Sequence, residues 1–268
     1  MKKALVTSGI KDEKKEQIIR MVEDAVRKGI KVIGLNDESG QRVVNRGTEL
    51  VDAILDKMRE LSLALPEVSY FGIADWQKLY GIALTPKQME AIAATSPSDA
   101  VLNSPCPFHK DRMIRETHFA FVGLDTVNII ELQRLNPKAT EPRFYSYAPD
   151  AWYFNEKFAT KEFLKLRWYL LLKDIVPGSE NKTFDEQKAM LPKEYEVPSA
   201  VAETAKDIFI HKKTGIYVNP NRYARTADLG SGGTRVSVGR CGAGGVGVAY
   251  GWGDRRSGSL GVAASRKF

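Results

Sequence analysis

Apolar and polar positions alternate near the C-terminal end of the chain. In residues 236–238, 246–248 and 260–262, two apolar side chains flank a Ser or a Gly. This period of two is typical of strands that bury one face. The stretches 240–245 and 253–258 between them are rich in glycine, which supplies the positive φ angles of tight turns. The pattern predicts three short antiparallel strands joined as a meander.

Earlier in the chain, apolar residues recur at helical spacing, with strand-like runs between them. Thr85, Pro86 and Gln88 have the order of an N-cap, a first helical residue and a capping-box partner. The spacing predicts a helix that starts at Thr85 and further helices over 12–29, 48–65, 125–135, 184–191 and 199–211. Apolar runs predict strands over 4–6, 31–35, 118–122 and 164–175.

The composition changes abruptly in the C-terminal segment. Residues 223–268 hold 12 of the 22 glycines, and residues 215–265 contain no Lys, Glu, Gln or Met. One explanation is an ordinary glycine-rich end of a domain. The other is that a different mutational process wrote this segment.

The residues between the apolar anchors favour the second explanation. They belong to the set encoded when the first two bases of an AAC or AAT codon are randomised, a set that lacks Lys, Glu, Gln, Met and Trp. Trp252 alone falls outside it and is expected to be a buried anchor. The candidate ligand-binding residues are Ser237, Arg240, Cys241, Ala243, Gly247, Ala249, Tyr250, Gly251, Asp254, Arg255, Arg256, Ser257 and Gly258.

This signature of adenine-directed mutagenesis resembles the variable proteins of diversity-generating retroelements. Residues 195–199, Tyr-Glu-Val-Pro-Ser, followed by Glu203, resemble the helix start of lectin folds of the formylglycine-generating-enzyme type. The ending 260–268 is similar to the closing strand of that family. The resemblance covers about residues 100–268 and is strongest from 163 onward.

The resemblance implies an α+β, C-type lectin-like domain that binds ligands through a variable segment at about 223–259. A smaller, mostly helical α/β region would precede this domain in the chain. The paired active-site cysteines of formylglycine-generating enzymes have no counterpart here, and the calcium-ligand motif of sugar-binding lectins is missing. We therefore expect a non-enzymatic protein without cofactor or metal, whose partner is a variable ligand, in particular a protein.

Length and charge set wider limits. The 268 residues suggest an accessory region for docking or oligomerisation over 1–95 and the lectin-like domain over 96–268. The N-terminal apolar run is too short for a signal peptide, and no stretch is long enough to span a membrane. Two distant cysteines argue against a disulfide framework. These features predict a cytoplasmic location, and a homo-oligomer would multiply weak sites.

Two other functions remain open from the sequence. The net charge of +7 and the aromatic-rich stretch 143–158 would suit a nucleic-acid-associated protein, although these aromatics are also typical of an irregular core. Cys106, His109 and His118 would suit a metal or thiol enzyme, but a fourth metal ligand and an orienting carboxylate are not evident. A nucleotide site in residues 4–35 lacks its glycine fingerprint.

Overall fold

The computed structural model describes residues 70–145 and 151–268. The chain divides into two compact units, Met1–Leu65 and Pro66–Phe268. The elements predicted within 4–65 lie outside the described residues, so the account below concerns the second unit.

The first sheet is mixed and has five strands. Its order is β1-β2-β3-β9-β4, with β1 parallel to β2 and the other neighbours antiparallel. The predicted strands over 118–122 and 164–175 are β2 and β3. The strands are β1 (Tyr70–Phe71), β2 (His118–Gly123), β3 (Arg167–Leu172), β4 (Tyr195–Glu196) and β9 (Ser265–Arg266).

The second sheet has four strands in the order β7-β6-β5-β8. The strands are β5 (Tyr223–Leu229), β6 (Arg235–Gly242), β7 (Gly245–Gly251) and β8 (Leu260–Val262). All three predicted C-terminal strands exist, but the predicted meander is wrong. β8 pairs in parallel with β5 at the far edge of the sheet, and does not pair with β7. The reason is that β5, which carries Arg225 and Thr226 at inner positions, completes the sheet without an apolar alternation that the sequence could reveal.

The helices are short, apart from the last. Thr85 caps α6, and its hydroxyl accepts a hydrogen bond from the amide of Gln88, as predicted. The helix predicted over 125–135 begins four residues later, because Asn128 is its N-cap. The helices are α5 (Ile73–Tyr80), α6 (Pro86–Ala93), α7 (Asp99–Leu102), α8 (Ile114–Thr117), α9 (Ile129–Leu135), η1 (Trp152–Asn155), α10 (Lys157–Thr160), α11 (Phe184–Ala189) and α12 (Ala200–Thr214).

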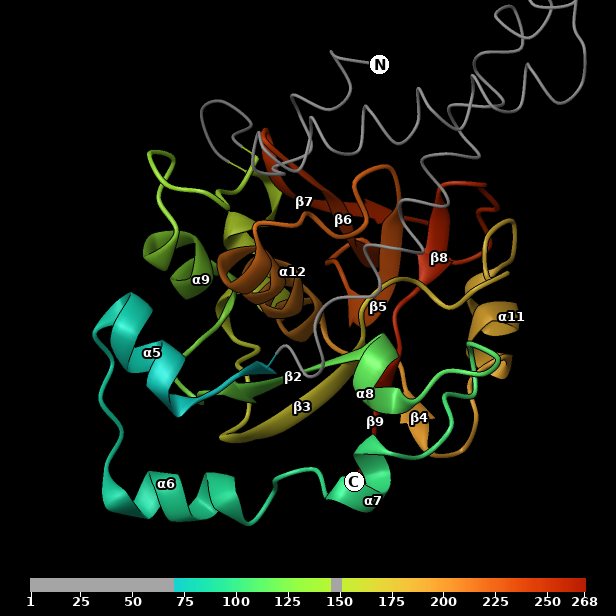
Figure 1. The fold of residues 1–268 in the computed structure, drawn as a ribbon. Coiled ribbons are helices and arrows are strands. Elements are labelled where there is room, and N and C mark those ends of the chain that lie inside the picture. The colour runs from blue at the N-terminus through green and yellow to red at the C-terminus, as the bar shows by residue number, and fades with distance from the viewer. Residues whose placement is uncertain (1–69, 146–150) are drawn as a thin grey trace, which may run out of the picture. The chain divides into compact units, whose positions relative to one another are not determined.

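Helix α12 is the centre of this unit. Ser199 caps it, Gly215 ends it at φ 70°, and every residue from Ala200 to Ile210 is buried. The helix contacts strands of both sheets, and Figure 1 shows it between β2 and β3 on one side and β5, β6 and β7 on the other. The prediction of a helix over 199–211 is confirmed, although Pro198 precedes the N-cap and lies outside the first turn.

Residues 70–80 belong to the same core, so the boundary predicted near residue 95 is displaced. Phe71 stacks on Phe209 of α12 with ring centroids 4.0 Å apart. The indole N–H of Trp76 donates to the carbonyl of Val122 in β2 at 2.9 Å. The compact unit accordingly begins at Pro66.

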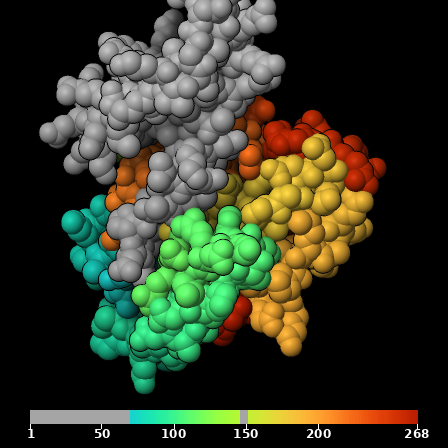
Figure 2. Space-filling view, turned by 45° about the vertical axis from the view of Figure 1, so that its right-hand side comes forward, coloured from blue at the N-terminus to red at the C-terminus, as the bar shows by residue number. Residues whose placement is uncertain are grey.

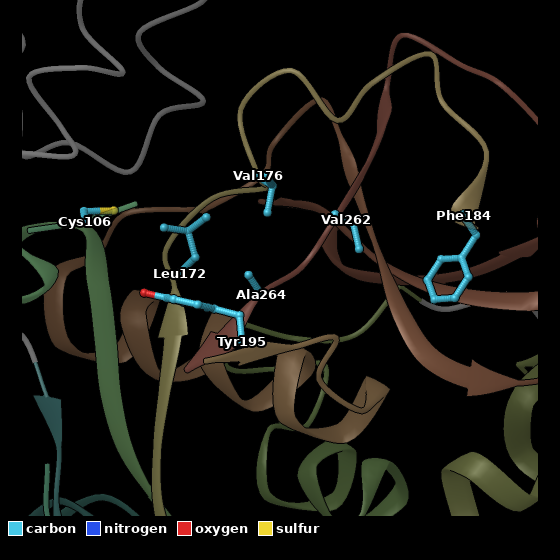
Figure 3. Packing of buried hydrophobic residues seen from close by; sticks show 7 residues of the cluster. All are labelled: Cys106, Leu172, Val176, Phe184, Tyr195, Val262 and Ala264. Atoms are coloured by element: carbon cyan, nitrogen blue, oxygen red, sulfur yellow. The ribbon is translucent and has the colours of Figure 1, made fainter. Parts of the chain in front are cut away.

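A separate cluster of buried side chains joins the first sheet to the C-terminal strand. Figure 3 shows its members, which come from β3, β4, β8, the start of α11 and the loop between α7 and α8: Cys106, Leu172, Val176, Phe184, Tyr195, Val262 and Ala264. Val262 of β8 and Ala264 after it thus fix the end of the chain in this cluster. Together the two sheets and the helices form a mixed α+β fold, as expected.

Candidate binding surface

The pairing of β6 with β7 assigns their side chains to two faces. Val236 lies opposite Tyr250, and Val238 lies opposite Val248. The four valines of these two strands are buried, and both strands contact α12. This face is the core face that the alternation predicted. Ser237, opposite Ala249, lies on the other face.

The segment 252–259 crosses the second sheet from one edge to the other, because it joins β7 to β8. The side chain of Arg225 lies beneath it and is 1% exposed. Its guanidinium donates to the carbonyl of Trp252 at 3.3 Å and to the carbonyl of Arg255. It also donates to the side-chain carbonyl of Gln187 at 3.0 Å. Arg225 therefore fixes the path of the segment through its main chain.

Two further hydrogen bonds hold the same segment by its carbonyl groups. The amide of Phe184 donates to Gly253 at 2.8 Å, and the amide of Asn181 donates to Ser257 at 3.0 Å. Figure 2 shows red atoms of the C-terminal part of the chain against the yellow and orange atoms of the part that includes α11. None of these bonds uses a side chain of the segment. Within the segment, the amide of Ser259 donates to the hydroxyl of Ser257 at 3.3 Å.

Arg256 is an exception among the exposed side chains. Its guanidinium donates to Glu186 of α11 at 2.8 Å and to the carbonyl of Asn181 at 3.1 Å. The hydrogen bond from Arg256 and the amide of Thr183 lower the pKa of Glu186 to about 2. Arg256 consequently has a structural partner and is less free to vary than its neighbours.

Most of the candidate ligand-binding residues lie at the surface. Ala249, Gly251 and Ser257 are half-buried. The exposed ones are Arg240, Ala243, Tyr250, Asp254, Arg255, Arg256 and Gly258.

Three candidates are buried, so their assignment to the surface is wrong. Ser237 lies under the crossing segment and is 4% exposed. Cys241 is fully buried, and burial raises the pKa of its thiol. A Cβ on Gly247 would lie 2.7 Å from the carbonyl oxygen of Gly239, which leaves no room for a side chain. The turn predicted at 240–245 is shorter than expected, and this places Cys241 inside β6.

Two tryptophans change the predicted surface. Trp252 was expected to be a buried anchor, but it is 63% exposed, because its carbonyl and not its ring is fixed to the core. Trp152, outside the predicted segment, contacts Tyr250 at 4.6 Å between ring centroids, and its indole N–H donates to Val248 at 2.9 Å. The aromatic run 143–158 was the only signal for it.

The outer edge of β7 is covered by another part of the chain. The amide of Val246 donates to the carbonyl of Arg143 at 2.7 Å, and the amide of Tyr145 donates to Val246 at 3.1 Å. Gly245 adopts φ 125° where this strand-like segment passes, and a Cβ there would lie 2.5 Å from the amide of Tyr145. Covering this edge protects it from pairing with other chains.

Three aromatic side chains of the stretch 143–158 lie in the core. Phe144, Tyr153 and Phe158 are at most 3% exposed and cannot stack on bases. The interpretation of these three as packing residues is confirmed. These three rings are therefore not part of a base-stacking platform, whereas Tyr145 is 37% exposed and Trp152 and Phe154 are half-buried.

Cys106 and His118 are both buried in the core. Cys106 lies in the cluster of Figure 3. Both ring nitrogens of His118 have partners, the hydroxyl of Thr117 at 2.9 Å and that of Tyr195 at 3.1 Å. Burial lowers the pKa of His118 to about 3, so the ring is neutral at physiological pH. Within 70–145 and 151–268, no three or more His, Cys, Asp or Glu side chains are grouped to hold a metal.

Comparisons of the chain with protein-family models, with curated proteins and with solved structures found no match. None of the helices in the described part of the chain combines the length and the apolar character that crossing a bilayer requires.

Proposed function

We propose that the chain is a ligand-binding protein whose C-terminal surface differs between gene copies, as in the variable proteins of diversity-generating retroelements. The proposal includes a lectin-like scaffold and a protein ligand. It has no catalytic role for the surface. The composition of the segment and the way that the segment is held both support it.

One observation carries the proposal. The segment 252–259 is fixed through its carbonyl groups by Arg225, Phe184 and Asn181, whereas Tyr250, Trp252, Asp254 and Arg255 expose their side chains. Such an arrangement allows side chains to change without a change of fold. A surface that must bind many different ligands requires this property.

The mutational origin can be tested in the DNA around the gene. We expect a near-copy of the sequence that encodes residues 223–268, which differs almost only where the copy has adenine, and a neighbouring reverse-transcriptase gene. The mismatches should fall on the exposed codons, including 240, 250, 254 and 255. If the neighbourhood contains no such copy, the proposed origin is wrong.

The tolerance of the surface can be tested separately with two libraries of the full chain. One randomises the open positions 243, 250, 251, 254, 255 and 258, and the matched one randomises the closed positions 225, 237, 239, 247 and 261. We expect most members of the first library, and few of the second, to resist proteolysis on the yeast surface. Equal survival of the two libraries would contradict the proposal.

A further inference from the structure

We propose that a single-stranded nucleic acid binds the face of the second sheet that lies opposite its valines. The site consists of two tyrosines and two arginines: Arg143, Tyr145, Tyr223 and Arg240. We call these four residues the tyrosine–arginine site. Arg143 and Tyr145 lie outside the segment 223–259, so this inference goes beyond the proposed function.

The register of the second sheet places Tyr223 on this face. Tyr223 lies opposite Gly239 in β6, and Gly239 lies opposite Gly247 in β7. The adjacent row contains Val238 and Val248, which are buried. Successive side chains of a strand point to opposite faces, so the row of Tyr223 faces away from the valines.

Residues 143–145 extend the same face beyond β7. Phe144 pairs in parallel with Val246, and both side chains are buried. Phe144 therefore belongs to the valine face. Arg143 and Tyr145, on either side of it, point to the opposite face, as Tyr223 does.

Each tyrosine ring lies against a glycine of the β6–β7 hairpin. A Cβ on Gly247 would lie 3.1 Å from the phenolic oxygen of Tyr223, and a Cβ on Gly244 would lie 2.9 Å from that of Tyr145. Because the two glycines are three residues apart, at most roughly 11 Å separates them. Tyr145 is 37% exposed and Tyr223 is half-buried. Two rings this close can stack on bases of one strand.

Arg240 completes the pair with Tyr223. Its guanidinium carbon lies 5.4 Å from the centre of the Tyr223 ring. Its backbone has φ 46°, which arginine rarely adopts, at the bulge where the pairing of β6 with β7 shifts between Gly239 and Gly242. Such strained residues reduce stability and are concentrated at binding sites. The strain at Arg240 is thus an independent sign of function.

Arg143 completes the pair with Tyr145. Its guanidinium donates to the carbonyl of Ala243 at 3.0 Å, which holds it at the turn of the same hairpin. Glu141, two residues earlier, accepts a hydrogen bond from Tyr217 at 2.7 Å. Among the residues that the structure describes, no carboxylate forms an ion pair with Arg143 or Arg240. Both charges are therefore available to phosphate groups.

The repetition of the pair favours a nucleic acid over a protein. A tyrosine with an arginine occurs twice on one face, and every nucleotide of a strand offers a base to stack and a phosphate to contact. A protein segment has no such repeat. The net charge of +7 adds a general attraction for a polyanion. A single strand is favoured over a duplex, because its bases are open to stacking.

The test measures how the full chain binds a fluorescein-labelled, twelve-nucleotide strand of thymidines, by anisotropy at several salt concentrations. Tyr145→Leu and Tyr223→Leu should each weaken binding by about fivefold or more, because each loses the stacking of one base. Leucine still covers the glycine in both variants. Tyr145→Phe keeps the ring and should bind as the wild type does.

The salt dependence distinguishes the arginines from the tyrosines. Arg143→Gln and Arg240→Gln should each make the slope of log K against log[salt] shallower by about 0.7, because each loses one phosphate contact of a single strand. The tyrosine variants should leave this slope unchanged.

Matched controls separate the site from general surface effects. Tyr70→Leu replaces an exposed tyrosine of β1, and Arg134→Gln removes the same charge from an exposed position on α9. Both should leave the affinity and the slope unchanged. Thermal unfolding checks the fold of every variant. If Tyr223→Leu loses the fold, Tyr145→Leu and Arg240→Gln, at exposed positions, still test the proposal.

Three results would overturn the proposal: no binding of the strand at low salt, controls that weaken binding as much as the site variants do, or tighter binding of a duplex of the same length. A poly-glutamate peptide that displaces the strand at equal affinity would indicate an acidic protein partner instead. The adenine-mutated gene copy tests the proposed function alone, so the two proposals can fail separately.

Discussion

Two glycines of β7 differ in the space that the structure leaves for a side chain. The carbonyl of Gly239 lies where Gly247 would place a Cβ, whereas the first contact of a Cβ on Gly251 is an arginine stem at 3.8 Å. Gly247 is thus needed for the close approach of two strands. Gly251 is open to substitution.

We expect Gly247→Ala to destabilise the fold by about 1–3 kcal/mol, as overpacking does. Gly251→Ala should change the free energy of unfolding by less than about 0.5 kcal/mol, as exposed substitutions do. Urea unfolding of both variants measures the difference. Equal effects would show that β6 and β7 are less closely packed than the structure indicates.

Arg225 differs from the exposed arginines, because its guanidinium donates its hydrogen bonds to acceptors inside the protein. Arg225→Met should lower the free energy of unfolding by about 2–4 kcal/mol, because several buried acceptors lose their donor. Amide exchange at residues 253–257 should become faster. Arg240→Met, at an exposed position, is the matched control and should alter neither quantity.

At the scale of an element, helix α12 carries charged residues that are buried between the two sheets. Glu203, Lys206 and Asp207 are all fully buried, which is rare for charged residues. The Lys206 ammonium lies 2.5 Å from Glu203 and 3.4 Å from Asp207. One cation therefore serves two carboxyl groups, and burial raises the pKa of Asp207 to about 8 in spite of Lys206.

This geometry predicts the direction of a pH effect. Asp207 is protonated in the folded chain at neutral pH but ionised in the unfolded chain above its ordinary pKa, so its contribution to stability falls as pH rises from about 4 to about 8. Unfolding of the wild type in this pH range releases the proton of Asp207, and Asp207→Asn has no such proton to release. We therefore expect the variant to gain stability relative to the wild type between pH 5 and pH 8.

Urea unfolding of both proteins at the two pH values tests this prediction. The comparison with the wild type cancels the titration of His118, which stabilises the fold less as pH falls from about 6.5 to about 3. The groups that act on Asp207 are Lys206, Glu203 and Asp174, and Cys241 lies near enough for Asp207 to affect its thiol. A constant difference between the proteins would mean that Asp207 is ionised in the fold.

At the scale of the whole molecule, the start of the second compact unit at Pro66 decides which contacts the unit contains. Phe71 and Trp76 pack on α12, and β1 pairs with β2. A chain that starts at residue 96 lacks these contacts and leaves the edge of β2 and the ring of Phe209 uncovered. A chain that starts at Pro66 keeps them.

We therefore expect a fragment of residues 66–268 to unfold cooperatively, with a melting temperature close to that of the main transition of the full chain. A fragment of residues 96–268 should be insoluble or lose cooperativity, because it leaves large apolar surface exposed. Differential scanning calorimetry of both fragments decides this. Cooperative unfolding of the shorter fragment would restore the boundary near 95.

Local patterns gave the sequence analysis its correct elements. The caps of α6 and α12, the strands β2 and β3, and the valine faces of β6 and β7 depend on neighbours within a few residues, and the sequence displays these directly. The exposure of Arg255 follows from turn chemistry, whereas Tyr250 lies opposite Val236 on the valine face and is exposed although the alternation predicts that it is buried. The sequence therefore predicted the surface position of most candidate residues.

Only the tertiary structure decided the pairing of β8 with β5, the place of Trp252 and the burial of Ser237 and Cys241. Each depends on a segment distant in the sequence, and Arg225 beneath residues 252–255 is the clearest case. An arginine whose acceptors are carbonyl groups leaves no pattern in the sequence, because every residue has a carbonyl. The sequence alone determined the turn residues and the apolar alternation of this surface, and long-range hydrogen bonds decided which side chains reach it.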